Sequence, residues 1–390
     1  MHLLLAIGGF EAELQRWGLE IPADHQVSDL FKDLVALWMK DDAATLCSKC
    51  VPAAIAGPAG AAPDDPLSYD RKARASRPGH VSPVVGEVCS ELRHTLEKYR
   101  KLIKRWPEWA PSLEKVASKA LWELNKALDR SWTALPETAG GRHRNLEIGL
   151  APKSKTWRNV FNVQRAPQFV TRLTKAELLH LNSLKHVLNE IPVLRDTLQS
   201  AVGAASSDAS PLLGKQFGHV ETEYRNVYSK VVSEAVAKLS QGPNSKLHKV
   251  LKSTAKAKGV EVERNVKDLI EPSTDETAQI LDGHHGQVFE GVWRDMTRGL
   301  WNHAAGVVLR FVEKLQRAHD NKENSRWHNH ILASEVTQQL KGFFEGVLRR
   351  KLGQNLRQRD LDPPRVAKEL KERLNTHHSH NLQANSFNVF

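Results

Sequence analysis

A long amphipathic stretch from Gln287 to Leu315 constrains this chain more than any other segment. Its apolar residues recur at steps of mostly three and four, at Val288, Val292, Met296, Leu300, Ala304, Val307, Val308, Phe311 and Leu315. This spacing predicts an α-helix with one continuous apolar face, which Trp293 and Trp301 widen. At about 1.5 Å per residue the helix is about 40 Å long. Such a helix must pack on others of similar length. The sequence therefore predicts an all-α fold, an elongated rod of stacked antiparallel helical bundles.

Composition indicates which partners and which compartment to expect. The 390 residues carry 56 Lys and Arg against 45 Asp and Glu, a formal net charge of +11. This excess favours acidic partners, namely anionic lipid headgroups, acidic protein surfaces or nucleic acid. Three cysteines, an odd number, do not make a disulfide framework, which predicts a reducing, cytoplasmic compartment. No apolar run approaches the ~20 residues of a membrane span, so we expect any membrane association to be peripheral.

Helical periodicity continues along most of the chain, and no period-two strand pattern is present. Besides the central helix, we expect helices at about 27–47, 82–103, 111–135, 174–198, 216–239, 244–258, 262–270, 327–356 and 365–374. A Thr-x-x-Glu capping box at Thr174 and Glu177 is expected to open one helix, and Ser273 with Glu276 to open the central one. The first predicted helix has on one side Leu30, Phe31, Leu34, Leu37 and Trp38.

Shifts in composition suggest how the chain is divided. Residues 1–26 are expected to form an N-terminal helix or a truncated start. A first half, 27–203, contains two expected flexible insertions, an Ala-, Pro- and Gly-rich segment at 51–80 and a basic segment at 135–168. A second half covers 204–376. The His- and Asn-rich residues 377–390 are expected to form a disordered tail.

Motifs that carry catalytic or metal chemistry are weak in this sequence. Cys47 and Cys50 form a lone CxxC, whereas a structural zinc site needs four ligands, so we interpret them as ordinary helix-end thiols. Adjacent histidines such as His284 and His285 cannot both face one site from a helix, and we expect solvated or capping roles. No Gly-rich phosphate loop and no GxSxG occurs. We therefore expect a protein that is not an enzyme, with no catalytic residue, cofactor, metal or small-molecule substrate.

Two clusters of basic residues are the main candidates for binding. The first is a lysine-rich helical segment, Lys246, Lys249, Lys252, Lys256 and Lys258, and the second is Arg349, Arg350 and Lys351 with Arg357 and Arg359. Each could contact an anionic membrane surface, at about 1 kcal/mol per basic residue. The alternative is that both are ordinary solvated helix faces. Nucleic-acid binding is less favoured because no aromatic residues alternate with these cations.

The order of the helical segments resembles the MUN domain, the helical module of the vesicle-priming proteins. Val84–Leu102 resembles the segment that opens its first homology region, and Leu30–Trp38 the aromatic-containing helix before it. Leu178–Leu198 is similar to a helix of the form L-x-x-L-N-x-L. Val288–Leu315 followed by Val336–Leu356 resembles the second homology region, and Asp360–Arg365 (DLDPPR) its end in plant relatives. The similarity covers residues 27–374 apart from the two insertions, as the C-terminal half of that domain.

This resemblance implies both a fold and an activity. The fold would be a rod of stacked helical bundles akin to tethering-complex subunits, and the activity would be to bind SNARE proteins and bridge a vesicle to its target membrane. In the best-known members an Asn and a Phe three residues later help to open the SNARE syntaxin. The corresponding positions here are Arg93 and Leu96. The resemblance therefore does not predict syntaxin opening by this chain. Leu96 remains the candidate residue for a partner-binding groove.

Two functions follow as hypotheses. The first is a non-enzymatic membrane-trafficking factor in vesicle priming or exocytosis, which binds SNARE or tethering partners through apolar grooves between helices and touches a membrane through its basic faces. The alternative is a basic helical scaffold that binds nucleic acid. A fixed-period internal repeat would favour this alternative, and none is visible in the sequence.

Overall fold

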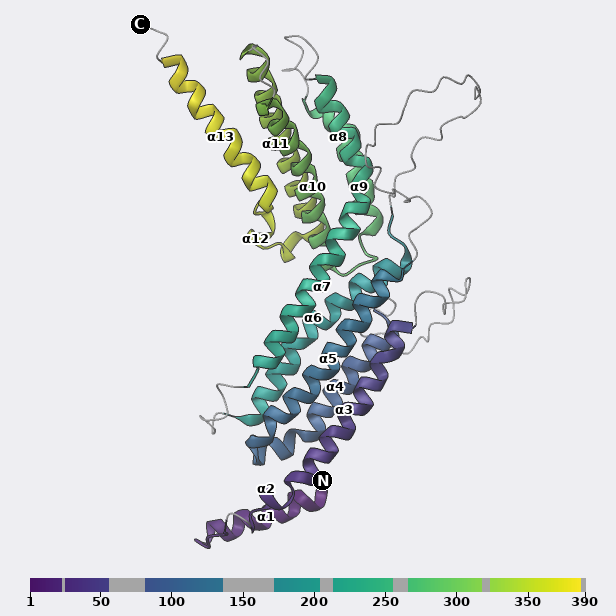
Figure 1. Cartoon of the computed structure of the whole chain (residues 1–390), viewed down its shortest axis with the longest axis vertical. Helices are drawn as coiled ribbons and strands as arrows, with labels where there is room; N and C mark the ends of the chain where they lie inside the picture. The colour runs from purple at the N-terminus through teal and green to yellow at the C-terminus, as the bar shows by residue number, and fades with distance from the viewer. Residues whose placement is uncertain are drawn as a thin grey trace, which may run out of the picture. The chain divides into compact units, whose positions relative to one another are not determined.

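The computed structural model describes residues 1–22, 25–55, 81–135, 172–203, 213–254, 266–317 and 323–386, without the side chains of 51–55, 316–317, 323–329 and 376–386. The described backbone forms α-helices and short 3-10 turns, with no β-strand in these ranges (Figure 1). The prediction of an all-α fold is confirmed. The chain divides into two compact units, and the predicted rod stays a prediction because each unit is described by itself.

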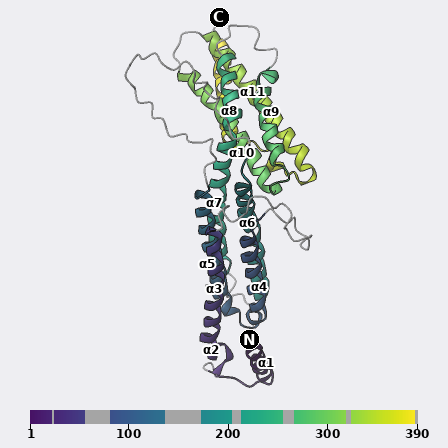
Figure 2. The same cartoon turned by 90° about the vertical axis from the view of Figure 1, so that its right-hand side faces the viewer.

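The first unit contains residues 1–135 and 175–231. Its elements are α1 (His2–Arg16), α2 (Val27–Leu30), α3 (Lys32–Ile55), α4 (Pro83–Arg105), η3 (Pro107–Trp109), α5 (Ala110–Thr133), α6 (Lys175–Val202) and the first part of α7 (Lys215–Leu239). The helices α3, α4, α5 and α6 pack along one another as a bundle (Figure 2). The apolar positions of α4 line its core, as their spacing predicts: Val85, Val88, Leu92, Leu96, Tyr99 and Ile103 are all buried.

A tryptophan corner joins α4 to α5. The rings of Trp106 and Trp109 lie 5.2 Å apart around the short η3 turn, and both are buried. Helix α1 packs against this corner through Gly8, where an added Cβ would lie 2.5 Å from the ring of Trp106. Only a glycine allows that approach without displacing the indole. Helix α1 therefore packs with the first unit, and the Glu11 carboxylate also accepts the N–H of Val27 at 3.1 Å.

A buried carboxylate fixes the start of α7. Glu114 on α5 accepts the backbone N–H groups of Gly214, Gln216 and Phe217 at 3.0, 2.9 and 3.1 Å. The first turn of a helix has no intrahelical acceptors for its N–H groups, so this distant carboxylate supplies them. The Tyr224 hydroxyl then donates to the carbonyl of Leu121 at 2.8 Å. Together these bonds hold α7 along α5.

The second unit contains residues 136–174 and 232–390. Its elements are the end of α7, α8 (Gln241–Thr254), α9 (Val266–His284), α10 (Glu290–Arg317), α11 (Glu323–Leu352), η5 (Gly353–Asn355), α12 (Gln358–Leu361) and α13 (Arg365–Ser386). The predicted central helix is α10, which packs on α8, α9, α11 and α13. Its predicted stripe is buried from Val288 to Phe311, and Trp293, 1% exposed, donates its indole N–H to the Leu281 carbonyl at 3.0 Å.

The boundary between the units differs from the predicted halves, which meet at residues 203 and 204. The structure places it inside α7, between Val231 and Val232. No break in periodicity marks this point, because α7 is one continuous helix. Where α10 crosses the end of α7, Gly299 lies so close to Val236 that an added Cβ would be 2.7 Å from its Cγ2 atom. The absence of a side chain at Gly299 therefore permits this close helix approach.

Several local predictions are corrected. Ser273 does not open α10: it lies inside α9, where its hydroxyl donates to the Pro243 carbonyl at 2.9 Å. The break before α10 is instead at Gly286, whose φ of +85° suits glycine. Helix α3 continues to Ile55, past the expected start of the first insertion at residue 51. Helix α13 continues to Ser386, through most of the predicted disordered tail, because neither Pro nor Gly follows Arg365.

The buried face of α3 is also not the predicted one. Leu30, Leu34 and Leu37 are 60%, 39% and 51% exposed. The residues that pack on α5 and α4 are Val35, Met39, Ala43, Leu46 and Cys50. Apolar residues occur on both sides of this helix, so periodicity alone does not choose the inward side. The remaining insertion residues, 56–80 and 136–168, lie outside the described ranges.

Candidate interaction surfaces

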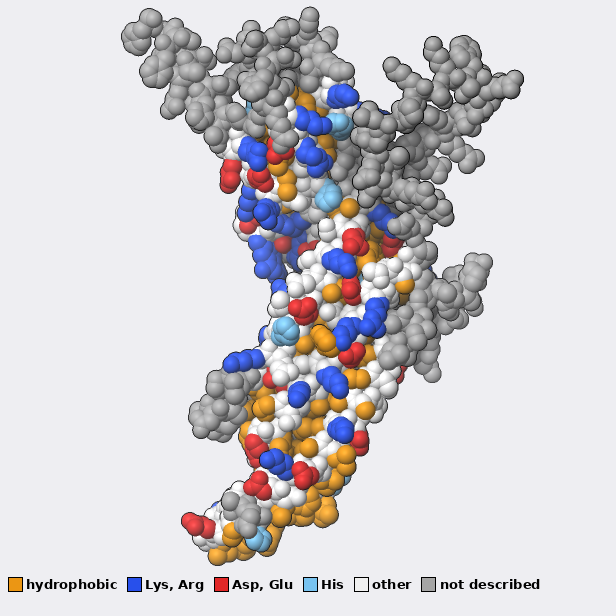
Figure 3. Space-filling model, in the orientation of Figure 1, with side chains coloured by type: hydrophobic (Ala, Val, Ile, Leu, Met, Phe, Trp, Pro, Cys, Tyr) orange, Lys and Arg blue, Asp and Glu red, His pale blue; other side chains and the backbone are white. Residues whose placement is uncertain are grey.

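A group of exposed cations surrounds α12 in the second unit. It begins at the C-terminus of α11, continues through η5 and α12, and ends at the first residue of α13. We call it the basic surface, and its members are Arg349, Arg350, Lys351, Arg357, Arg359 and Arg365. Lys and Arg side chains gather around α12 in the space-filling view (Figure 3). Three of the predicted contacts, Arg349, Arg350 and Lys351, are thus brought together with Arg357 and Arg359, while Arg365 was missed.

The buried Asp360 connects the α12 part of this surface to α10 through hydrogen bonds. Its buried carboxylate accepts the guanidinium of Arg294 at 3.2 Å and the backbone N–H of Arg357 at 3.0 Å, which caps α12. Its backbone carbonyl accepts a bond from Arg298 at 2.6 Å. Arg294 and Arg298 come from α10, so the cations of α12 are anchored to the central helix. Two of its partners, Arg294 and Arg298, are more than sixty residues away along the chain, so sequence reasoning did not connect them to Asp360.

Most cations of the basic surface have no acidic partner. Lys351 pairs with Asp282 at 2.8 Å. Within the described part of the chain, no carboxylate lies within 4 Å of the guanidinium groups of Arg349, Arg350, Arg357, Arg359 or Arg365. Asp360 is occupied by Arg294, which leaves Asp362 as an exposed acid of the segment 349–365. The positive N-terminal end of α13, which starts at Arg365, adds to the same field. This arrangement favours binding of a polyanion or an anionic surface.

The lysines of α8 form a weaker candidate. Lys246 pairs with Glu276 of α9 at 3.0 Å, so its charge is already compensated. Lys249 and Lys252 are exposed. Lys256 and Lys258 lie outside the described residues. Two exposed lysines on α8 resemble a solvated helix face more than a binding site.

Leu96 does not line an open groove. It is 2% exposed in the core of the first unit, so this prediction is corrected. Three residues before it, the Arg93 guanidinium donates to Glu190 of α6 through Nε at 2.8 Å, which ties α4 to α6. This hydrogen bond raises the pKa of Arg93, against the opposing effect of burial. A leucine at this helical position faces the bundle interior, where it packs instead of binding a partner.

The first unit exposes apolar side chains at its α1–α3 end. We call this the apolar surface, and its members are Leu3, Phe10, Trp17, Leu19, Leu30, Leu34 and Leu37. Leu3 is 72% and Trp17 70% exposed. On α1, Leu3, Phe10 and Trp17 recur every seven residues and therefore share one face. Large apolar side chains that cluster on a surface mark a site for a partner, in contrast to scattered single ones.

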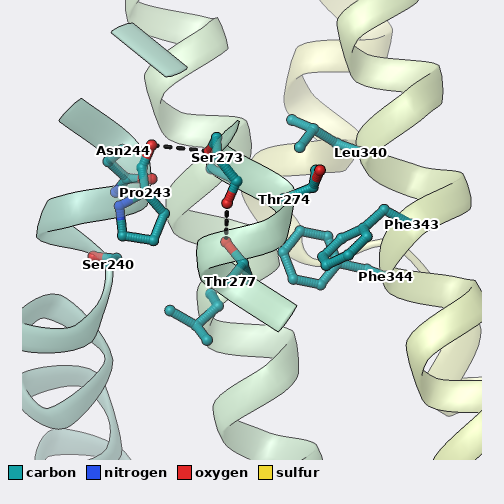
Figure 4. A pocket seen from close by; sticks show the side chains of 11 residues that line it. Ser240, Pro243, Asn244, Ser273, Thr274, Thr277, Leu340, Phe343 and Phe344 are labelled. Carbon is teal, nitrogen blue, oxygen red and sulfur yellow. Dashed lines mark hydrogen bonds between the residues drawn. The ribbon is translucent and has the colours of Figure 1, made fainter. Parts of the chain in front are cut away.

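Two cavities are lined by described residues of the second unit. One of about 10 Å³ has room for a single water molecule. Figure 4 shows Ser273 and Thr277 of α9 between Pro243 and the rings of Phe343 and Phe344. The Thr277 hydroxyl donates to the Ser273 carbonyl at 2.8 Å. A larger groove of about 370 Å³ runs between α9 and α11, with charged residues such as Lys267 and Glu271 on its α9 side.

Titratable groups with altered pKa values are structural. Burial raises the pKa of the Cys50 and Cys89 thiols to about 12, so neither is a thiolate at neutral pH. Both are free cysteines, as is Cys47. Burial lowers the pKa of His180 to about 4, and its Nδ1 lies 3.3 Å from the Ser131 hydroxyl. Desolvation in the core is the largest cause of each shift; Glu190 also raises the pKa of Cys89, and Asp129 opposes the lowering of the His180 pKa.

His284 is a buried histidine of the second unit. His284 is 1% exposed rather than solvated; its Nε2 accepts the N–H of Leu173 at 3.0 Å. Across the described ranges, no three His, Cys, Asp or Glu side chains are placed to hold a metal ion. Over the same ranges, no helix combines the length and hydropathy needed to cross a bilayer.

Comparison with known proteins leaves the family open. No family model matches the sequence, and no curated protein matches it. The resemblance to the MUN domain therefore stays a prediction from the order of helical segments. What can be argued about function comes from the basic surface, the apolar surface and the all-α architecture.

Proposed function

We propose that this protein is a non-enzymatic membrane-trafficking factor, which binds an anionic membrane peripherally and holds SNARE or tethering partners during vesicle priming. The observation that carries the proposal is the basic surface, where five cations lack acidic partners among the described residues. At about 1 kcal/mol for each basic residue near an anionic bilayer, these five supply several kcal/mol of attraction. The anchoring of α12 through Asp360 keeps them in place before binding, which lowers the entropic cost.

The apolar surface supports the second half of the proposal. A partner helix with an apolar face buries side chains such as Phe10, Trp17 and Leu34 when it packs along α1–α3. At roughly 25 cal/mol per Å² of apolar area removed from water, several such side chains are enough for specific binding. Amphipathic helices of this kind are what the resemblance to the vesicle-priming module leads us to expect of a SNARE or tethering partner.

Co-sedimentation with vesicles tests the membrane part. The purified chain should sediment with phosphatidylserine-containing vesicles and not with pure phosphatidylcholine, and added salt should weaken the binding. Arg349→Glu with Arg350→Glu should reduce the affinity at least tenfold. Lys249→Glu with Lys252→Glu on α8 is the matched control, since it reverses the same charge in the same unit, and it should have a smaller effect.

Binding of assembled SNARE bundles tests the protein part. Leu34→Ser with Leu37→Ser should weaken capture of the bundle and leave vesicle binding unchanged. The proposal is wrong if the protein ignores both anionic vesicles and SNARE bundles yet binds RNA with a steep salt dependence. That result would favour a nucleic-acid-binding scaffold instead.

A further inference from the structure

One edge of α5 in the first unit carries cations around a half-exposed tryptophan. Its residues follow one another at steps of three and four, so they lie along one line of the helix. They are Lys115, Lys119, Trp122, Lys126 and Arg130. The line is about 22 Å long at 1.5 Å per residue. Helix α5 packs on α3, α4 and α6 and hydrogen-bonds to α7, whereas Lys115, Lys119, Trp122 and Arg130 on this edge are exposed to solvent.

The tryptophan at the centre of this α5 edge is unusually exposed for a large aromatic side chain. Trp122 is 42% exposed, whereas Trp109 and Trp132 at either end of α5 are buried. The ammonium of Lys126 lies 3.1 Å from the centre of the Trp122 ring. This cation–π contact holds the indole against the helix surface with a cation beside it. An apolar ring with an N–H group and a neighbouring cation suits a boundary between water and an apolar phase.

The acids near the α5 edge are already paired. Glu123 pairs with Lys126 at 3.3 Å, and Asp129 pairs with Lys230 of α7 at 3.0 Å. Glu114 is buried and caps α7. Lys115, Lys119 and Arg130 have no carboxylate within 4 Å in the described ranges. The α5 edge is therefore a line of excess positive charge with one apolar side chain in its middle.

We infer that the α5 edge is a further contact surface for acidic phospholipids, with its cations on the headgroups and Trp122 at the headgroup level. A straight helix edge can touch a planar bilayer along its whole length. Tryptophan is enriched at membrane interfaces because its ring is apolar and its N–H is polar. The lysines place their charges over anionic headgroups while their methylene stems cover the helix surface. This contact lies in the first unit and does not depend on the basic surface.

Single-stranded nucleic acid fits the same charges less well. Proteins that bind single strands follow the backbone along a positive groove and stack successive bases on several aromatic rings. The α5 edge has a single exposed ring along its length, and this ring is already covered on one side by Lys126. A bilayer needs no series of rings, so a lipid surface is the occupant that these residues favour.

The test is vesicle binding by the full chain with paired variants. Lys115→Glu with Lys119→Glu should lower the affinity for phosphatidylserine-containing vesicles about twenty- to thirtyfold. Trp122→Ala should lower it about fivefold, and Trp122→Tyr, which keeps an interfacial aromatic ring, less than twofold. Lys101→Glu with Lys104→Glu reverses two exposed cations on α4 and is the matched control, expected to change the affinity less than threefold. Thermal unfolding of each variant checks that the fold is retained.

A second readout locates the tryptophan directly. Vesicles that contain spin-labelled lipid should quench the wild-type fluorescence more than that of Trp122→Phe, because Trp122 reaches the headgroups. Equal quenching, together with an unchanged affinity of the double lysine variant, would overturn the inference. Inorganic phosphate should not compete for the α5 edge, and competition by a single-stranded oligonucleotide that is lost in Trp122→Ala would identify nucleic acid instead.

The outcome separates this inference from the proposed function. One outcome is that Arg349→Glu with Arg350→Glu leaves vesicle affinity unchanged while Lys115→Glu with Lys119→Glu lowers it. That result refutes membrane binding by the basic surface and supports membrane binding by the α5 edge. The reverse result refutes the α5 edge alone. A wild-type chain that binds no anionic vesicles refutes both membrane contacts.

Discussion

The two units are built by the same helix packing but expose different chemistry. Among the described residues, the large hydrophobic side chains that are exposed belong to the first unit, apart from Leu269. The second unit instead exposes unpaired arginines around α12. Burial in the two cores is equally complete, as Tyr99 and Trp293 show. The difference lies in side-chain chemistry: the first unit exposes most of the large apolar side chains, and the second exposes the arginines around α12.

The largest expected effect is the loss of stability when a core residue of the second unit is removed, which tests whether the two cores unfold separately. Trp293→Ala should destabilise the second unit by about 3–5 kcal/mol, because it removes a fully buried ring and its hydrogen bond to Leu281. Hydrogen exchange should rise in α9–α11 and remain unchanged in α3–α6. Trp122→Ala, at an exposed position, should cost under about 1 kcal/mol. Equal effects of the two substitutions would contradict the assignment of their burial.

Acid should weaken the first unit through His180. Burial lowers its pKa in the folded protein to about 4, below the ordinary 6.5 of the unfolded chain. Between these values the unfolded chain binds more protons, so stability falls as the pH drops from 6.5 to 4, by about 3 kcal/mol in total. Chemical denaturation of wild type and His180→Gln at several pH values measures this. The variant should lose most of that slope, whereas His219→Gln, on the exposed side of α7, should keep it.

Two glycine substitutions test close packing in the second unit. Gly299→Ala places a Cβ 2.7 Å from Val236 and should destabilise by about 1–3 kcal/mol. Gly346→Ala on α11 meets nothing within 4 Å and should stabilise by about 0.5–1 kcal/mol through helix propensity. Urea denaturation measures both. A stabilised Gly299→Ala would show that α10 and α7 do not approach so closely.

The smallest expected change concerns the apolar surface. Leu34→Ser with Leu37→Ser should alter the free energy of unfolding by less than about 1 kcal/mol, because both side chains are exposed. Leu46→Ser on the buried side of the same helix should cost several times more. Denaturation midpoints measured side by side give the ratio. A large loss for the exposed pair would mean that this face belongs to the core, and the contrast between the units would disappear.

The sequence predicts best where one apolar face is continuous. The spacing from Val288 to Phe311 identifies the central helix and its buried side, because polar residues occupy the other side. It fails on α3, where Leu34 and Val35 are equally apolar and only packing on α5 decides between them. It fails at Ser273, whose hydroxyl bonds to Pro243 on another helix instead of capping its own. Local propensity does not determine such long-range bonds.

The candidate sites were predictable only in part, for a related reason. Arg349, Arg350 and Lys351 are adjacent in sequence, so their clustering follows from the chain itself. Lys246 looks unpaired in sequence, but Glu276 reaches it from α9. Leu96 belongs to the apolar stripe of α4, so helical spacing places it in the core, and only the resemblance to the vesicle-priming module suggested a partner groove. The anchoring of Asp360 to α10 has no local signal, because Arg294 and Arg298 reach it from a distant helix.

Hydrogen exchange of the full chain with and without phosphatidylserine-containing vesicles tests the central claim most directly. Residues 349–365 form the end of α11 and two short helical elements, η5 and α12, so their amides should report contact with a membrane. We expect slower exchange in this segment when vesicles are present, lost at high salt and in Arg349→Glu with Arg350→Glu. Vesicle binding with no change of exchange in 349–365 would contradict the account.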